Sequence, residues 1–471
     1  MPAQLENAHL ADLHALAAEL GVERFRMLSR DELTAAILER DPDATAPERE
    51  PAEAEPEEGD GAGDGTDAGG SGANGSGSGS GGSGNRRGRR GGRGGRGRRT
   101  SERETDEGED VEDEEEEQDA GEPVTGILDI TPRGHGFIRV SGLGSDEDDV
   151  YVSPSQIRRC EMRRGDEVSG PASKPRRGER YPALIHVDTI NGVEPGAEAK
   201  RLADATPVHP NRRIALEPAE GASEDEAVLV RSIDLLNPLA RGQRVLVEAA
   251  AGAGRTTLLR ALAASLAAVE DLELVVLLID ERPEEVAEWS ERVPEDALAI
   301  ATAEMRSGEQ LRLVELAFGR ASRRAERGAD VVLLVDSLSR IAVAADDPDR
   351  VKPIFGAGRE TEEEGMGSLT VVATTIDEGE DEGDVLRALD TTESSRIVLD
   401  RALAAAGVYP AIDAGAARVA GEEHIREEAE LAAVRALRAQ LDGLSAAEAA
   451  ARLRERIIDS ADNAALLASL S

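Results

Sequence analysis

The chain of 471 residues is long enough for two or three domains, and its net charge of -41 argues against nucleic-acid binding over the whole surface. Aromatic residues make up only 2% of the chain, and its single cysteine excludes an internal disulfide. The N-terminal sequence lacks the features of a secretory signal, and no apolar run approaches the roughly 20 residues of a membrane helix. We therefore expect a cytoplasmic protein with no membrane segment and with only local nucleic-acid contacts. Its acidity is expected to serve solubility or adaptation to a salty cytoplasm.

The first part of the chain, residues 1–45, predicts a small helical module. The segment "LADLHALAAELG" has leucines at helical spacing and ends at Gly21. The following segment "SRDELTAAILER" begins with Ser29 and Glu32, which together form the pattern of a capping box. Such a module is more typical of packing or docking than of a catalytic site.

Residues 46–121 form a biased insert that we expect to be disordered. Glycine and serine repeats are followed by "NRRGRRGGRGGRGRR" and then by an acidic run, and none of these can bury enough apolar surface to offset the entropy of ordering. Arginine and glycine alternate over residues 86–99, a composition that binds phosphates and stacks on unpaired bases. This favours contact with RNA, although pairing with the neighbouring acidic run is an alternative.

Residues 122–192 change to short apolar segments separated by turns. Five such segments in about seventy residues predict a small β-barrel of the oligonucleotide-binding or cold-shock type. Three of the few aromatic residues of the chain, Phe137, Tyr151 and Tyr181, lie here among arginines. Aromatic rings beside cations are what stacking on single-stranded bases requires, whereas packing in the barrel core is the alternative.

Residues 193–471 alternate between apolar strands and helices. We expect strands within residues 244–250, 272–280, 297–303, 330–336, 368–375 and 395–400, and helices over residues 256–269, 283–290 and 309–326. Strands without polar alternation are buried on both faces. The pattern therefore predicts a mostly parallel sheet between layers of helices.

The segment "AAAGAGRTTLLRALA" has the pattern of a phosphate-binding loop at the start of a helix. Gly252 and Gly254 supply the cradle, and the Thr256 hydroxyl is a candidate ligand of Mg²⁺. Asp336 ends the apolar strand "VVLLVD", where a carboxylate can hold Mg²⁺ through water, and Glu281 ends the neighbouring strand, where it can activate a water molecule. Loop and carboxylates in this order favour a nucleotide site over plain strand caps.

Several segments together resemble bacterial transcription termination factor Rho, a family of hexameric RecA-type RNA helicases. They are "DVYVSPSQIRR", "GERYPAL", "TPVHPNRR", "NPLARGQRVLV", "LLIDERPEEV", "VVLLVDSLSRIA" and "VYPAID". The resemblance covers the N-terminal helices and everything after about residue 122. It implies an OB-fold domain before a RecA-type P-loop NTPase domain, a homo-hexamer, ATP and Mg²⁺ as cofactors, and single-stranded RNA and RNA polymerase as partners.

The resemblance also implies two sets of site residues. The RNA-binding residues would be Phe137, Arg139, Asp149, Tyr151, Arg176, Glu179 and Tyr181. The nucleotide-binding residues would be Gly252, Gly254, Arg255, Thr256, Thr257, Asp336 and Tyr409, with Tyr409 stacking on adenine and with Thr256 and Asp336 holding Mg²⁺. Glu281 and Arg401 would be catalytic. His135 stands where the family usually has phenylalanine, so one stacking contact is altered.

The departures from the family pattern concern the motor. Arg255 replaces the lysine of the phosphate loop, and Gly252 replaces a second lysine. Residues 344–356 are shorter than the family's RNA-gripping loop, and the acidic segment 377–384 takes the place of the other pore loop. The arginine finger is also not kept in register, because Arg418 is near its place but does not match its spacing.

These departures leave two functions open. The first is a termination factor that binds nascent RNA through the barrel and couples ATP binding and hydrolysis in a hexameric ring to transcript release. The second is an RNA-binding, nucleotide-sensing scaffold that modulates termination without moving along RNA. Loss of an arginine finger alone can lower phosphoryl transfer by about 10³ to 10⁵, so we expect hydrolysis to be weak or lost.

Overall fold

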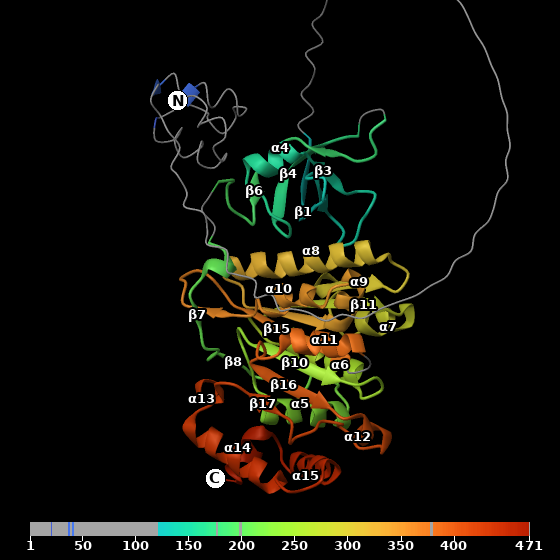
Figure 1. The fold of residues 1–471 in the computed structure, drawn as a ribbon, viewed down its shortest axis with the longest axis vertical. Coiled ribbons are helices and arrows are strands. Elements are labelled where there is room, and N and C mark those ends of the chain that lie inside the picture. Colours follow the sequence, from blue (N-terminus) through green and yellow to red (C-terminus); the bar gives the residue numbers. More distant parts are fainter. Residues whose placement is uncertain are drawn as a thin grey trace, which may run out of the picture. The chain divides into compact units, whose positions relative to one another are not determined.

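The computed structural model describes residues 20, 36–37, 40–41, 121–175, 178–196, 200–376 and 380–470, without the side chains of residues 380–382. The chain divides into two compact units, residues 1–107 and 108–471. Apart from the few residues named, the predicted N-terminal module and the insert as far as residue 120 lie outside this description. The second unit contains a β-barrel and an α/β domain (Figure 1).

The barrel begins at the first described strand. Its elements are β1 (Glu122–Ile130), β2 (Gly136–Arg139), β3 (Val150–Val152), α4 (Pro154–Arg159), β4 (Glu167–Ser173), β5 (Ala183–Leu184) and β6 (Thr189–Ile190). The sheet order is β1-β2-β3-β5-β4-β6, and an additional pairing of β1 with β4 closes the barrel. All five predicted strands are therefore present, and the two-residue strand β6 was not predicted.

The short barrel strands alternate between a buried and a partly exposed face. On β3, Val150 and Val152 are buried in the barrel core while Tyr151 between them is partly exposed. On β2, Ile138 is fully buried and Phe137 is partly exposed. Because successive side chains of a strand point to opposite faces, both aromatic rings lie on the outside of the barrel core.

The α/β domain follows a connecting segment with short paired strands. Its first half consists of η2 (Leu202–Asp204), β7 (Pro207–Val208), β8 (Arg213–Ile214), α5 (Glu224–Leu236), β9 (Leu239–Ala240), β10 (Arg244–Ala249), α6 (Arg255–Ala267), β11 (Glu273–Glu281), α7 (Pro283–Ser290), η3 (Glu295–Ala297) and β12 (Leu298–Thr302).

The second half continues the alternation and ends in helices. It consists of α8 (Ser307–Glu326), β13 (Val331–Asp336), α9 (Leu338–Ala345), η4 (Pro348–Val351), α10 (Lys352–Phe355), β14 (Glu360–Thr361), β15 (Leu369–Ile376), α11 (Glu380–Leu389), β16 (Ser395–Leu399), α12 (Arg401–Ala405), β17 (Arg418–Val419), α13 (Glu422–Ile425), α14 (Glu428–Leu441), α15 (Ala446–Ile458) and α16 (Asn463–Ala468). No described helix is long and apolar enough to cross a membrane.

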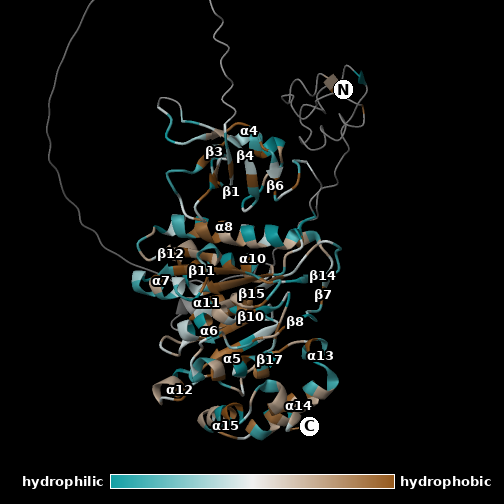
Figure 2. Ribbon diagram, turned by 180° about the vertical axis from the view of Figure 1, so that it is seen from behind, coloured by the Kyte–Doolittle hydropathy of each residue, from teal (hydrophilic) through white to brown (hydrophobic). Residues whose placement is uncertain are grey.

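The main sheet confirms the predicted parallel architecture. Its order is β12-β11-β13-β15-β10-β16-β17, and only the edge strand β17 is antiparallel to its neighbour. On β13, Val332 and Leu334 pack into a core with α5 and α6, whereas Leu333 and Val335 pack into a core with α8 and α9. Both faces of the sheet are thus buried, and the central strands β11 and β15 are hydrophobic in Figure 2.

The two segments that are expected, from the family resemblance, to take the place of pore loops contain helical structure in their described residues. Residues 348–355 form η4 and α10, because Val351 and Phe355 are buried at helical spacing. In the acidic segment 377–384, α11 begins at Glu380 and continues to Leu389, which is fully buried with Val385 nearby. The structure does not describe residues 377–379 of that segment.

Candidate RNA-binding and nucleotide-binding sites

A cluster of four rings lies on the outer face of β2 and β3. Phe137 and Tyr151 are cross-strand partners, with ring centroids 6.0 Å apart. Tyr181 lies 5.1 Å from Phe137, and His135 lies 5.6 Å from Phe137 and 5.7 Å from Tyr151. The structure thus brings the three predicted aromatic residues together, and His135 joins them although it departs from the family pattern. Partly exposed rings at these spacings form a platform on which bases can stack.

Arg139 and Asp149 do not lie at the surface where direct RNA contacts would be made. Arg139 is 5% exposed and Asp149 is 1% exposed, and the two form an ion pair. The other guanidinium nitrogen of Arg139 pairs with Asp129, which is also buried. The predicted role in direct RNA contact is therefore revised: a buried ion pair is held in place by its partners, and the guanidinium of Arg139 supports Phe137 from 5.6 Å.

The rim of the cluster carries further polar residues. The guanidinium of Arg180 lies 5.2 Å from the ring centre of Tyr181, a cation–π contact that the sequence did not single out. Glu179 is exposed beside it. Arg176 lies outside the described residues, so its predicted contact with RNA stays a prediction.

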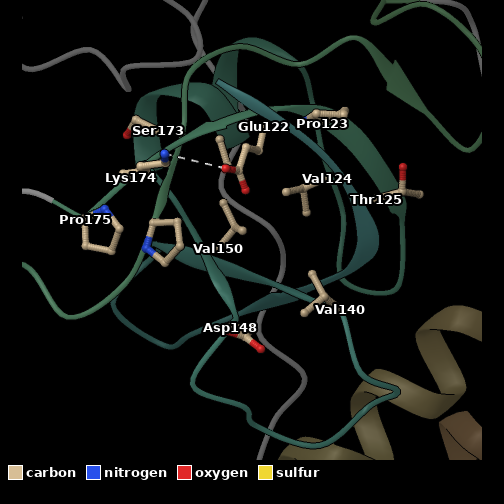
Figure 3. Close-up of a pocket in the computed structure, with 12 residues that line it drawn as sticks. Glu122, Pro123, Val124, Thr125, Val140, Asp148, Val150, Ser173, Lys174 and Pro175 are labelled. Carbon is tan, nitrogen blue, oxygen red and sulfur yellow. Dashed lines mark ion pairs between the residues drawn. The ribbon is translucent and has the colours of Figure 1, made fainter. Parts of the chain in front are cut away.

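A separate cavity of about 450 Å³ opens at one end of the barrel (Figure 3). Val150 lines it from the core side of β3, and Lys174 and Glu122 face each other across it at 3.8 Å. Val150 and Tyr151 point to opposite faces of β3. The cavity is therefore distinct from the ring cluster, and it is lined mainly by strand ends and prolines.

The phosphate loop, Glu281 and Asp336 lie at the carboxyl edge of the main sheet. The phosphate loop follows β10, Asp336 ends β13 and Glu281 ends β11, all in parallel strands. Gly254 caps α6 in the left-handed region with φ of 95°, and Gly252 has φ of 75°. Side chains are rarely accommodated at these angles, so the backbone explains glycine at both positions. The N-terminus of a helix is a site where backbone N–H groups bind phosphate oxygens.

A cavity of about 510 Å³ lies at this edge. The residues that line it are Ala250, Ala251, Gly252, Gly254, Arg255, Thr256, Thr257, Arg282, Ser339, Arg340, Val343 and Ile376. The predicted loop residues are thus brought together. Arg282 and Arg340 were not predicted, although both occur in the segments "LLIDERPEEV" and "VVLLVDSLSRIA" that carry the family resemblance. Arg340 pairs with Asp280 at 2.8 Å.

Asp336 is not among the described residues that line the cavity. The side chain of Arg255 lies against its carboxylate instead. The Arg255 Nε atom lies 3.0 Å from Asp336 Oδ1, which also accepts a hydrogen bond of 2.9 Å from Thr374. Asp336 Oδ2 is buried and has no hydrogen-bond partner among the described residues. Thr256 faces the cavity, but the predicted carboxylate ligand does not. The described side chains therefore do not present Thr256 and Asp336 together to a Mg²⁺ ion in this arrangement.

Glu281 lies half-buried close to the same carboxylate. Burial raises its pKa, and repulsion from Asp336 raises it further, whereas Arg255 acts in the opposite direction. A carboxyl group with a raised pKa is a better acceptor for the proton of a water molecule. Its position at the end of β11 is therefore compatible with the predicted role, although Glu281 is not among the described residues lining the cavity.

Three further predicted or nearby residues, Tyr409, Arg401 and Arg418, are not among the described residues that line the cavity. Tyr409 packs against the core that contains α5 and α6, and burial together with nearby Asp225 raises its pKa to about 12. Arg401 is exposed at the first position of α12. The backbone of Arg418 pairs with Arg396 of β16, which fixes the main chain at the sheet edge, and its side chain is exposed. The predicted roles of Tyr409 and Arg401 at the nucleotide therefore stay predictions.

The fold and the two sites define an RNA-binding barrel followed by an α/β ATPase domain with a phosphate-binding loop. Residues 124–196 match the family model "Rho termination factor, RNA-binding domain", residues 4–44 match "Rho termination factor, N-terminal domain", and residues 230–347 match "ATP synthase alpha/beta family, nucleotide-binding domain". The chain belongs to the Rho family of transcription termination factors.

Two relatives illustrate this similarity. The chain is 38% identical over 312 residues to transcription termination factor Rho of Haemophilus influenzae. The aligned region covers 61% of this chain and 73% of the relative. It is 37% identical over 330 residues to transcription termination factor Rho of Escherichia coli K12, with 65% and 78% covered. The similarity extends over most of each relative.

Proposed function

We propose that this protein binds single-stranded RNA on the ring cluster and ATP in the cavity beside the phosphate loop, and that it acts in transcription termination. The observation that carries the proposal is the outward pairing of Phe137 and Tyr151 across β2 and β3. Two rings on adjacent strands bind successive bases without regard to sequence. Tyr181 and His135 extend the platform.

Four domains organise this function in our proposal. They are an N-terminal module of residues 1–45, an insert of residues 46–121, an RNA-binding domain of residues 122–192 and an ATP-binding domain of residues 193–471. The β-strands of the barrel run from Glu122 to Ile190, which supports the third range.

The protein acts as a homo-hexamer on transcribing RNA polymerase in this proposal. Arg401 supports a ring, because it is exposed and lies outside the described lining of its own cavity. In a ring, a basic residue so placed can contact a nucleotide held by a neighbouring subunit. Tyr409 is likewise assigned to adenine on the family resemblance. The nucleotide would then lie between subunits.

The ion pair of Arg255 with Asp336 favours the second candidate function, a nucleotide-sensing scaffold. Hydrolysis in this class of site uses the loop residue on phosphate and the strand carboxylate on Mg²⁺. Here Arg255 and Asp336 contact each other, and of the two predicted Mg²⁺ ligands only Thr256 is among the described residues that line the cavity. We therefore assign the site to nucleotide binding with weak or no hydrolysis.

Transcript release from stalled elongation complexes tests the proposed function. We expect the protein to alter the fraction of released RNA, because it binds the emerging transcript. A scaffold gives the same change with ATP and with a non-hydrolysable ATP analogue, whereas a motor requires ATP. No effect on release in either condition, with RNA binding intact, would rule out a role in termination.

The arginine and glycine segment of the insert adds a further expectation. We expect residues 86–99 to contribute affinity for RNA with little sequence preference, and deletion of this segment to flatten the salt dependence of binding. The slope on single strands is about -0.7 per phosphate neutralised. Titrations at several salt concentrations measure it. If the salt dependence of RNA binding has the same slope with and without the segment, the segment is only a spacer.

A further inference from the structure

The position of Arg255 suggests how nucleotide is held in the cavity. Its side chain lies between the cavity, which it lines, and the buried carboxylate of Asp336. Asp336 is only 3% exposed, and Thr374 holds Oδ1 from the strand β15 side. A positive charge is thus already fixed at the place where a metal ion would compensate this carboxylate.

An arginine holds this position more firmly than the usual lysine would. Its guanidinium is always charged, planar and able to direct several N–H groups at once, whereas a lysine ammonium is a compact charge that moves freely. A buried carboxylate is costly without a partner. Thr374 donates only a neutral hydrogen bond, so Arg255 is the cation that compensates Asp336.

The surroundings of the cavity provide further positive charge for phosphate. Arg282 and Arg340 line it, and the glycine-rich turn exposes the start of α6. Of these arginines, Arg340 is held by Asp280. The cavity therefore offers guanidinium groups and backbone N–H groups to an anion, while its one predicted metal carboxylate is covered.

We propose that Arg255 takes the place of the metal ion at this site, so that the protein binds nucleotide diphosphates and triphosphates equally well with and without Mg²⁺. This inference rests on the proposed nucleotide binding and adds to it. Arg255 serves as the fixed cation between Asp336 and the phosphates, and the glycine turn supplies the N–H groups. The site then reports nucleotide concentration without responding to the metal.

Calorimetric titration of the full-length protein with ADP, in Mg²⁺ and in EDTA, tests the inference. We expect dissociation constants within about twofold of each other in the two buffers. Arg255→Lys should weaken binding in EDTA and acquire a Mg²⁺ response of about tenfold or more, because a mobile ammonium replaces the planar guanidinium that both contacts Asp336 and lines the cavity. Arg260→Lys is the matched control, since Arg260 lies on the same helix but contacts Glu285 and Glu288 instead.

The variant Asp336→Asn distinguishes Arg255 from a metal ion as the cation, because the two possibilities predict different changes in affinity for ADP. If Arg255 is the cation, removal of the competing carboxylate frees the guanidinium, and affinity for ADP in EDTA rises. If metal is required, the same variant loses affinity in Mg²⁺. Circular dichroism checks that each variant is folded.

The outcomes separate the inference from the function on which it rests. Binding of ADP that is about tenfold or more tighter in Mg²⁺ than in EDTA would overturn the inference and leave the nucleotide-binding function intact. Absence of ADP binding in both buffers would overturn the nucleotide-binding function, and the inference with it. Equal binding, together with a new Mg²⁺ response in Arg255→Lys, supports both.

Discussion

Replacement of Phe137 and Tyr151 together by alanine should lower the affinity of the protein for single-stranded, pyrimidine-rich RNA by about 30-fold or more. Each stacked base contributes about 1–3 kcal/mol by alanine substitution, and every 1.4 kcal/mol corresponds to about tenfold in affinity. Both rings lie on the outer face of the barrel strands, so their removal leaves the core residues Val150, Val152 and Ile138 in place. Fluorescence anisotropy with a labelled oligonucleotide measures the effect.

A control variant separates stacking from general damage to the barrel. Ile185 is 44% exposed on the same domain and makes none of the described ring contacts. Ile185→Ala should therefore leave RNA affinity unchanged. If the double aromatic variant binds RNA as tightly as the unmodified protein, the ring cluster is not the RNA-binding site.

ATP hydrolysis by the unmodified protein, measured with RNA present, should be far below the median enzyme turnover of about 10 s⁻¹. One reason is the ion pair of Arg255 with Asp336. The family resemblance adds two expected defects, which are an acidic segment at the place of one pore loop and an arginine finger out of register. Arg255→Lys alone should restore little activity, because the expected defects of the pore segment and of the arginine finger remain. A phosphate-release assay with and without RNA measures turnover.

Two further variants test the possibility that the unmodified protein is an active ATPase. If the unmodified protein hydrolyses ATP near the median rate, Glu281→Ala and Asp336→Ala should each abolish that activity, because they remove the group that activates water and the group that binds metal. Such a result would return the protein to the ordinary motor class. Arg260→Lys again serves as the control on α6.

The sequence predicted the barrel and its aromatic residues because local patterns determine both. Short apolar segments fixed the strands, and the scarcity of aromatic residues drew attention to Phe137, Tyr151 and Tyr181. The burial of Arg139 and Asp149 could not be predicted in the same way. Their ion pair depends on which side of the strands they face and on Asp129 from another strand, and this is settled only by packing.

The sequence predicted where the main chain places the phosphate loop and the two strand ends, but it did not predict the ion pair between Arg255 and Asp336. Parallel strands bring their carboxyl ends to one edge, so the order of the loop, Glu281 and Asp336 along the chain was sufficient to place them together. The sequence also marked Arg255 as unusual. It could not indicate that Arg255 would cover Asp336, because that depends on the direction of a long, flexible side chain.

The packing of Trp289 makes the nucleotide-binding domain spectroscopically distinct. It is the single tryptophan of the chain, and it is fully buried at the end of α7, the helix that follows Glu281. The guanidinium of Arg260 lies 5.6 Å from its ring centre, so its environment joins α7 to the phosphate-loop helix α6. Selective excitation of the indole therefore gives a fluorescence signal from Trp289 alone, which reports on the contact between these two helices and contains no emission from the tyrosines of the barrel. A change in that emission on addition of nucleotide would track rearrangement of α6 against α7 without any attached dye.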